Sequence, residues 1–369
     1  MDLDYANATH SVFEDRLLEE LRGNSDVIIY GAGLSGQYVC KMLDDNGIKV
    51  ACFVDGSERK QGLTIYERPV YSLEKAVSVF SDFAIVIASM WYEEIRDKIL
   101  ETYPDRKAMI WNGLSTMNWE TVNGQTRSEE IEYINEHEKE FERLLNELAD
   151  EESRKTLEGI LNYRLTRKME YLEKIRSKKR AYIDDSIISA RFKKMINDRS
   201  IIDAGAFDGD SLVEFLQVFE GCRSYYCYEA DKSNVEILKN REHKPDVSIR
   251  VIQKALIDKS GLELKFSGSG LSGRIGDDGY VVETTTIDDS EILSLGFVKM
   301  DIEGAERDAL EGGRRTIAQN KPILAVCAYH LQDDLLVLPR VIKSIYSGYN
   351  LYLRHYLLSS GETVLYAIP

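Results

Sequence analysis

The sequence has little proline, little cysteine and no long apolar run. It contains 6 prolines and 5 cysteines in 369 residues. The cysteines show no CxxC spacing, so the sequence indicates neither a disulfide framework nor a zinc site. The apolar stretches 83–88 and 323–329 fall short of the roughly 18 to 20 residues that a membrane span needs. We therefore expect no membrane-spanning helix. The first residues also lack a basic region followed by an apolar run, which favours a cytoplasmic protein.

Positive charge is scarce as well. The chain has 47 Lys and Arg residues against 63 Asp and Glu residues, and its net charge is −16. This is the wrong sign for a protein that neutralises phosphate backbones, so we expect no nucleic-acid partner. Hydrophobic residues make up 43% and charged residues 30%, as in ordinary folded domains. At roughly 150 residues per domain, the length favours two or three domains.

Strand and helix signals alternate in two regions, one at each end of the sequence. Such alternation builds parallel sheets covered by helices. We predict an α/β protein with two Rossmann-like parallel-sheet domains, residues 1–117 and 198–369, joined by a helical connector at residues 118–197. In the second domain we expect a β-hairpin around the glycines of residues 268–279, and an antiparallel strand pair at the end of the chain.

The connector is expected to consist of packing helices. Between residues 128 and 179 it has few glycines, no proline, many charges and apolar residues at helical spacing. Such charge patterns usually mark a solvent-exposed face, so we place no chemistry there. These helices could also pair with a second copy of the chain, which would make a homodimer.

The strongest chemical signal is the segment IDAGAFDGDS at residues 202–211. A strand ends at Asp203, Gly205 would let the backbone approach a ligand, and Gly209 would relieve the turn before a helix. Glu229 lies 26 residues after Asp203, which is the length of one βαβ unit. A carboxylate at this place can accept hydrogen bonds from the hydroxyl groups of a ribose. The residues expected to bind a cofactor here are Asp203, Gly205, Asp208, Gly209, Asp210, Ser211 and Glu229.

The acids of this loop favour S-adenosylmethionine over NAD. An NAD site would normally show three close glycines and a tight turn, whereas this loop is longer and carries Asp208 and Asp210. S-adenosylmethionine carries a sulfonium and an ammonium group, and Asp203 at the strand end would meet that positive charge.

Four segments of the C-terminal domain resemble the FkbM family of S-adenosylmethionine-dependent methyltransferases. They are IDAGAFDGDS, YEAD (228–231), VKMDIEGAE (298–306) and the closing YH, LRHY and ETVLYA (329–330, 353–356 and 362–367). The connector segment LADEESRKTLEGILNYRLT also resembles a stretch that precedes this domain in some members. The resemblance implies a class I methyltransferase fold and methyl transfer to a hydroxyl group, typically of a sugar, glycolipid or polyketide.

Three residues at strand ends are candidates for catalysis. Asp301 and Glu303 follow the expected strand FVKM, and His330 ends the next one. Ligands of such sheets bind beyond these carboxyl ends. His330 is the preferred general base because its ordinary pKa lies near 6.5, with Asp301 and Glu303 orienting the acceptor. The same three side chains could instead hold a divalent metal ion.

The N-terminal domain carries a second glycine-rich loop, YGAGLSGQ. Gly31, Gly33 and Gly36 lie between a strand and a helix, and Asp55 ends the second strand. The segment resembles the nucleotide-sugar-binding domain of bacterial sugar acyltransferases, with FVDGS and RPVY as matching pieces. It could therefore bind a sugar nucleotide. The alternatives for this domain are a dehydrogenase site and a scaffold domain that binds no ligand.

The most specific function consistent with these features is an S-adenosylmethionine-dependent O-methyltransferase that acts on a sugar or glycan-linked hydroxyl. Its partner would be a small-molecule or glycan acceptor. The alternatives are a non-catalytic two-domain nucleotide-binding or scaffold protein, and a nicotinamide-dependent oxidoreductase.

Overall fold

The computed structural model describes the chain in several ranges. These are residues 1–11, 13, 15–23, 26–89, 91–105, 110–113, 126–241, 247–267, 274–276 and 279–369. Contacts divide the chain into two compact units. Unit 1 comprises Met1–His137, Glu158–Arg176 and Leu357–Gly361, and unit 2 comprises Glu138–Leu157, Ser177–Tyr356 and Glu362–Pro369. The predicted boundary at residue 117 lies outside the described residues, and the domain limits stay predictions.

Unit 1 contains a six-stranded sheet in the order β3-β4-β2-β1-β5-β6. All its pairs are parallel except β3 with β4. The strands are β1 (Asp26–Tyr30), β2 (Val50–Val54), β3 (Thr64–Ile65), β4 (Arg68–Tyr71), β5 (Phe83–Ile87) and β6 (Ile110–Asn112). The helices that lie wholly in this unit are α1 (Asp15–Gly23), α2 (Leu34–Asp45), α3 (Leu73–Val79), α4 (Tyr92–Thr102), α6 (Arg127–Glu136) and α9 (Glu170–Ile175), with the 3-10 turn η1 (Tyr5–Asn7). The strand order reverses between β1 and β5, so the loops after these strands flank the crevice where such sheets bind ligands.

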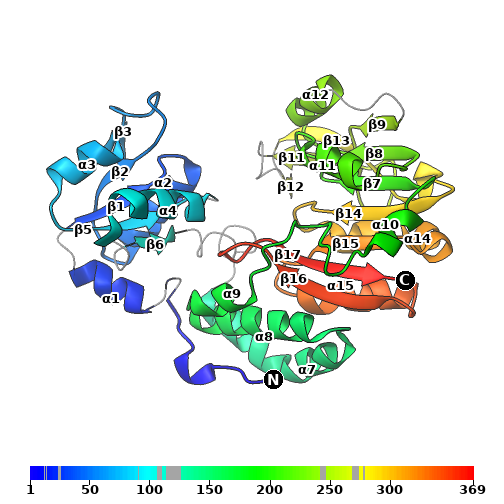
Figure 1. Cartoon of the computed structure of the whole chain (residues 1–369), viewed down its shortest axis with the longest axis horizontal. Coiled ribbons are helices and arrows are strands. Elements are labelled where there is room, and N and C mark those ends of the chain that lie inside the picture. The colour runs from blue at the N-terminus through cyan, green and yellow to red at the C-terminus, as the bar shows by residue number, and fades with distance from the viewer. Residues whose placement is uncertain are drawn as a thin grey trace. The chain divides into compact units, whose positions relative to one another are not determined.

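Unit 2 is built on a seven-stranded sheet in the order β16-β17-β15-β14-β7-β8-β9, with β9 uppermost in the view of Figure 1. Its strands are β7 (Ser200–Ala204), β8 (Ser224–Tyr228), β9 (Ser248–Ile252), β14 (Leu295–Met300), β15 (Ile323–Cys327), β16 (Asn350–His355) and β17 (Thr363–Ile368). The helices are α7 (Glu138–Glu147), α10 (Ala190–Met195), α11 (Asp210–Val218), α12 (Lys232–Asn240), α13 (Glu306–Glu311), α14 (Arg314–Asn320) and α15 (Asp334–Ile345). Helix α8 (Glu151–Thr166) contributes to both units.

The central strands of unit 2 are buried along their whole length and are mostly apolar. Every residue of β7, β14 and β15 is buried, as expected of parallel strands covered on both faces. Phe215 of α11 and Phe219, which directly follows this helix, pack on Phe297 of β14 with ring centroids 5.4 and 5.3 Å away. The strand order reverses between β7 and β14, so the carboxyl ends of these two strands define the ligand-binding edge.

A small sheet stands where the chain passes from β9 to β14. It consists of β10 (Ala255–Leu256), β11 (Glu263–Ser267), β12 (Arg274–Gly276) and β13 (Tyr280–Thr285), followed by the 3-10 turn η5 (Asp288–Ser290). Strands β11 and β13 pair antiparallel, as the sequence predicts. Of the glycines expected at the turn, residues 268, 270 and 273 lie outside the described residues. The antiparallel pair at the chain end, β16 with β17, is confirmed, and so is the α/β fold with parallel-rich sheets.

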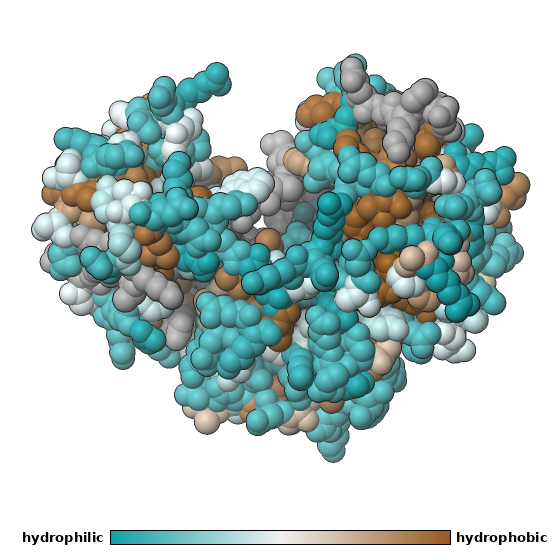
Figure 2. All heavy atoms as spheres, viewed as in Figure 1, coloured by the Kyte–Doolittle hydropathy of each residue, from teal (hydrophilic) through white to brown (hydrophobic). Residues whose placement is uncertain are grey.

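The helices of the expected connector show an exposed polar face. Figure 2 shows mostly hydrophilic side chains on the visible face of α7 and α8. Among the described residues, none of the helices combines the length and the hydrophobicity that crossing a membrane requires.

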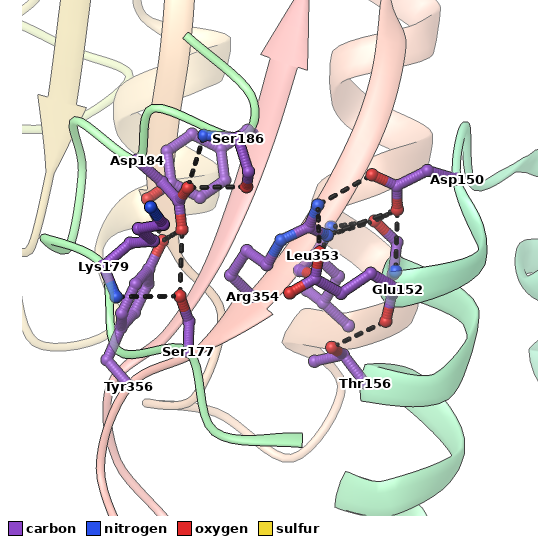
Figure 3. Close-up of polar contacts among 12 residues, drawn as sticks. Asp150, Glu152, Thr156, Ser177, Lys179, Asp184, Ser186, Leu353, Arg354 and Tyr356 are labelled. Atoms are coloured by element: carbon purple, nitrogen blue, oxygen red, sulfur yellow. Dashed lines mark hydrogen bonds and ion pairs between the residues drawn. The ribbon is translucent and has the colours of Figure 1, made fainter. Parts of the chain in front are cut away.

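The edge strand β16 of unit 2 is covered by the segment that connects α7 to α8. Leu148 forms a parallel bridge with Leu351, and the Ala149 N–H donates to the Leu351 carbonyl at 2.8 Å. Arg354 of β16 is 1% exposed, and its guanidinium contacts Asp150 at 2.7 Å and Glu152 at 3.2 Å (Figure 3). The covered edge cannot pair with another chain, and the buried cation is neutralised.

We expect Asp150→Ala to destabilise unit 2 by about 2 to 4 kcal/mol, because it removes charge-assisted bonds to Arg354 and the cap on the Ser153 N–H. Urea denaturation measures this loss. Glu151→Ala, which removes a neighbouring exposed carboxylate, is the matched control and should cost less than about 1 kcal/mol. Equal losses in the two variants would contradict the role given to Asp150.

Candidate active site

The loop after β7 is fixed to the two neighbouring strands. The N–H groups of Gly205 and Ala206 donate to the Tyr228 carbonyl at 2.9 and 3.1 Å. Gly205 has φ 76°, and a Cβ at this position would lie 1.8 Å from the Asp301 carbonyl oxygen. The glycine is therefore required by the close approach of the chain beyond β14. Gly209 has φ 87° and precedes α11, where a left-handed residue starts the helix.

Asp203 at the end of β7 forms a buried ion pair. Its carboxylate lies 3.0 Å from Lys299 Nζ and accepts from the Tyr225 hydroxyl at 2.8 Å. Lys299 also donates to the Gly205 carbonyl at 2.6 Å. Burial raises the pKa of Asp203 and would lower that of Lys299, but Asp203 and Asp301 raise the pKa of Lys299 above its ordinary value. The structure thus gives the Asp203 charge a partner within the protein, and its predicted contact with a cofactor cation stays a prediction.

Glu229 directly follows β8 and points toward the β7 loop. Its carboxylate accepts from the N–H groups of Phe207 and Asp231, each at 2.7 Å. The side chain is 7% exposed, and this burial raises the pKa of Glu229. Two backbone donors fix its orientation, while a carboxylate can accept about four hydrogen bonds in all. Glu229 therefore keeps acceptor capacity for ligand hydroxyls.

The other predicted cofactor residues lie at the start of α11. Asp208 pairs with Arg241 at 2.9 Å and accepts from the Asp210 N–H at 3.1 Å. Asp210 in turn accepts from the Ser211 N–H at 2.6 Å. These contacts make an acidic rim of exposed and half-buried side chains beside the loop of Gly205 and Gly209.

A second group of charged side chains gathers beyond β14 and β15. The imidazole of His330 lies with Nε2 at 3.3 Å from Asp301 and 3.8 Å from Glu303, and with Nδ1 at 2.9 Å from Glu306. Glu306 also accepts from the N–H groups of Ile302 and Gly304 at 2.8 and 3.0 Å. Asp301, Glu303 and His330, which the sequence predicts to act together, are brought together here.

The carboxylates change the expected chemistry of His330. Burial would lower its pKa, but Glu306 and Asp301 raise the pKa of His330 well above its ordinary value of 6.5. Carboxylates on both sides of the ring favour the imidazolium form, in which both nitrogens carry a proton. A general base must be unprotonated, so this environment argues against the role predicted for His330 and favours one in holding the carboxylates in place.

Asp301, Glu306 and His330 each offer an atom within 4.8 Å of the others, which is compatible with a metal site. However, Glu306 already accepts from two backbone N–H groups and lies 2.9 Å from His330, and the two imidazole nitrogens face carboxylates on opposite sides. The carboxylates of Asp301 and Glu306 therefore already have donors within the protein.

Several neighbours of Asp301 are not predicted from the sequence. Tyr182 donates to Asp301 at 3.0 Å, and Tyr329 lies 3.4 Å from Asp301 and 3.5 Å from Glu362. Tyr182 has φ 64° and is placed by a turn in which buried Asp184 accepts from the Ser177 and Ser186 hydroxyls (Figure 3). The position of Glu362 could have been predicted from the sequence. It precedes a strand expected to be antiparallel, and the start of such a strand lies at the edge where the parallel strands end.

The glycine loop of unit 1 is also close-packed. A Cβ on Gly31 would lie 2.7 Å from the Ala88 carbonyl oxygen, and one on Gly36 would lie 1.7 Å from the Gly31 carbonyl oxygen. Gly33 faces open space, with Lys60 Nζ at 3.9 Å from such a Cβ. Asp55 accepts from the Ala32 N–H at 2.9 Å and pairs with Lys60 at 2.9 Å.

Unit 2 has the parallel-rich fold of class I methyltransferases, and a family model matches most of it. Residues 203–342 match the family model described as "Methyltransferase FkbM domain". Residues 203–342 thus form an FkbM methyltransferase domain, the domain of S-adenosylmethionine-dependent methyltransferases. Residues 23–110 match a second family model, "C2185-like, N-terminal". The resemblance of this region to sugar acyltransferases stays a prediction.

Solved structures agree with this fold. The chain is similar to methyltransferase FkbM from Methylobacillus flagellatus KT, with 22% identity, a TM-score of 0.66, and coverage of 97% of this chain and 94% of that one. The chain also has a low similarity to precorrin-6y C5,15-methyltransferase from Geobacter metallireducens GS-15, with 13% identity, a TM-score of 0.30, and coverage of 52% of this chain and 90% of that one. No curated protein matches the chain.

We expect Gly205→Ala to destabilise unit 2 by about 2 to 5 kcal/mol, because it adds a steric clash to the cost of a left-handed residue. Gly261→Ala is the matched control, since Gly261 has φ 75° and no atom within 4 Å of the added Cβ. That variant should lose only about 1 to 2 kcal/mol. Urea denaturation of both proteins tests the expectation, and a Gly205→Ala protein as stable as the control would refute it.

Proposed function

We propose that the protein transfers a methyl group from S-adenosylmethionine to a hydroxyl group of a sugar or glycan-linked acceptor. The observation that carries this proposal is the pair of adjacent sites at one edge of unit 2. Glu229 and the Gly205 loop lie beside β7 and β8, and Asp301, Glu303 and His330 lie beyond β14 and β15. β7 and β14 are neighbours, so a cofactor and an acceptor would meet at the switch point.

The donor set at the first site fits the cofactor. Glu229 has lone pairs for ribose hydroxyls, and the acidic rim of Asp208 and Asp210 suits a cationic amino-acid group. S-adenosylmethionine supplies an already activated methyl group when bound. The protein therefore has to bind the cofactor and the acceptor, align them, and remove the proton of the acceptor hydroxyl. These are tasks of positioning and acid–base chemistry.

The second site suits a polyhydroxylated acceptor. The side chains of Asp301 and Glu303 are 26% and 34% exposed, so their oxygens are accessible to ligand hydroxyls while His330 beneath them is buried. Carboxylates are strong acceptors for such hydroxyl groups. The match to a methyltransferase domain favours this enzyme over a non-catalytic scaffold or a nicotinamide-dependent oxidoreductase. The cytoplasmic location and the homodimer stay predictions.

The proposed function is tested with methyl-labelled S-adenosylmethionine and a panel of sugar nucleotides and glycans. Mass spectrometry should find the label on a sugar oxygen. Labelling confined to nitrogen or carbon atoms would overturn O-methylation, and labelling of only non-sugar hydroxyls would overturn the acceptor class.

We expect Glu229→Ala to weaken S-adenosylmethionine binding about 10- to 150-fold, because each lost charge-assisted hydrogen bond is worth about 1.5 to 3 kcal/mol. Titration calorimetry gives the Kd. Glu236→Ala, which removes an exposed carboxylate from α12, is the control and should bind as the wild type does. Unchanged affinity in Glu229→Ala would exclude Glu229 from the cofactor site.

For unit 1 we propose a sugar-nucleotide site at the loop of Gly31, Gly33 and Gly36, with Asp55 holding Lys60 beside it. The N-terminus of α2 and Lys60 would both attract a diphosphate. Gly33 is the position where an added side chain meets open space and would therefore occupy the place of a ligand.

Gly33→Val should accordingly abolish saturation-transfer NMR signals of UDP- and GDP-sugars on the full chain, while S-adenosylmethionine binding persists. Gly23→Val serves as the control, because its Cβ also meets open space. Signals that survive in Gly33→Val would remove the loop from the site. Signals from NAD alone in the wild type would favour a dinucleotide site instead.

A further inference from the structure

Glu362 lies at the same edge of the sheet as the predicted catalytic residues. Strand β17 runs antiparallel to β15, and Val364 pairs with Cys327 at the carboxyl end of β15. The residue before an antiparallel strand is therefore brought to the edge where the parallel strands end. Glu362 has φ 59°, an uncommon conformation for a non-glycine residue that is often found at functional sites.

The carboxylates of Glu362 and Asp301 have opposite environments. Asp301 accepts from Tyr182 at 3.0 Å and faces the imidazolium of His330 at 3.3 Å, with Lys299 close by. Glu362 accepts from the Tyr329 hydroxyl at 3.5 Å, a long hydrogen bond. Asp301 is thus held by strong donors, whereas the half-buried Glu362 keeps most of its acceptor capacity.

These environments separate the acidities of the two groups. Burial and the charge of Asp301 raise the pKa of Glu362 to about 7, against opposing effects of His330, Lys299 and Tyr329. Burial also acts on Asp301, but His330 and Lys299 hold the pKa of Asp301 well below its ordinary value. Of the remaining titratable neighbours, Tyr182 and Cys327 have raised pKa values and are neutral. Paired carboxyl groups with separated pKa values mark acid–base sites.

We propose that Glu362 is the catalytic residue that accepts the proton of the acceptor hydroxyl, an inference that rests on the proposed O-methylation. The acceptor oxygen forms a bond to the methyl carbon while the carbon–sulfur bond breaks and its electron pair goes to sulfur. The hydroxyl proton goes to the Glu362 carboxylate, so atoms and charges balance. Tyr329 joins Glu362 to Asp301, which with Glu303 holds the acceptor in place.

The other candidates at this edge suit the task less well. Protonated His330 has no lone pair to offer. Asp301 is a weak base, because a group that holds its charge so firmly takes up a proton poorly at neutral pH. Glu303 remains as the rival, since it is half-buried and lies 3.8 Å from His330.

The experiment compares wild type, Glu362→Gln, Glu303→Gln and Glu291→Gln. Glu291 is the matched control, because it is exposed, has φ 52° and receives the same substitution in the same unit. The acceptor panel is assayed from pH 5 to pH 9, and titration calorimetry records S-adenosylmethionine binding. We expect Glu362→Gln to lower kcat about 100- to 10,000-fold with unchanged cofactor Kd, and Glu291→Gln to behave as the wild type.

The pH profile gives a readout that a structural role would not produce. Glu362 must be ionised to accept a proton, so wild-type kcat/KM should rise with pH up to about 7, and this rise should vanish in Glu362→Gln. Tyr329→Phe removes a donor that lowers the pKa of Glu362, so the midpoint should move to higher pH. Retained turnover in Glu362→Gln, or its loss in Glu303→Gln alone, would overturn the proposal.

A direct titration decides the matter if no acceptor in the panel is methylated by the wild type, an outcome that would count against the proposed function. Carbon-13 NMR of glutamate-labelled protein, compared with Glu362→Gln, identifies the Glu362 carboxyl signal. A midpoint near 7 supports the proposal. A midpoint at the ordinary value of about 4.3 overturns it, because such a carboxylate would be as weak a base as any exposed one.

Discussion

The geometry of the active-site edge depends on Lys299. Its ammonium group lies in the middle of unit 2, where it pairs with Asp203 of β7 and donates to the Gly205 carbonyl. Lys299 itself belongs to β14, so a single side chain joins the two strands between which the strand order reverses. The loop after β7 also packs closely against the Asp301 carbonyl at Gly205. The Gly205 loop and the strand end at Asp301 are therefore held against each other, as the alignment of the proposed cofactor and acceptor sites would require.

Charges alternate in sign along this edge. Asp203, Lys299, Asp301, His330 and Glu306 follow one another, and each cation lies between two anions. Buried charges are tolerated when each is paired in this way. Glu362 lies beside Asp301, the middle member of this series, and is joined to it through the Tyr329 hydroxyl. The negative charge of Asp301 and burial make the ionised form of Glu362 less stable. Burial and the charge of Asp301 thus give Glu362 an acidity that suits proton transfer near neutral pH.

The sequence predicts the sheets well, because parallel strands buried on both faces appear as short apolar runs such as SIIDA and FVKM. It also predicts that Asp301, Glu303 and His330 meet, since all three follow parallel strands. It does not predict the raised pKa of His330. This shift depends on the contact between the imidazole and Glu306, which lies at the start of α13. Tyr182 is missed for a related reason. It reaches Asp301 through an irregular turn held by Asp184, and such turns leave no periodic signal in the sequence.

Glycines show where sequence patterns are ambiguous. The sequence pattern predicts a close approach of a ligand at Gly205 and a nucleotide-binding loop at Gly31 and Gly36. At each of these three positions, a carbonyl group of the protein itself fills the space of the missing side chain. A Rossmann-like strand–loop–helix turn needs these glycines for its own packing, with or without a ligand. Gly33 is different, because nothing in the fold fills its side-chain space closely. The proposed ligand site at the glycine loop of unit 1 therefore depends on Gly33 and on the ammonium group of Lys60 beside it.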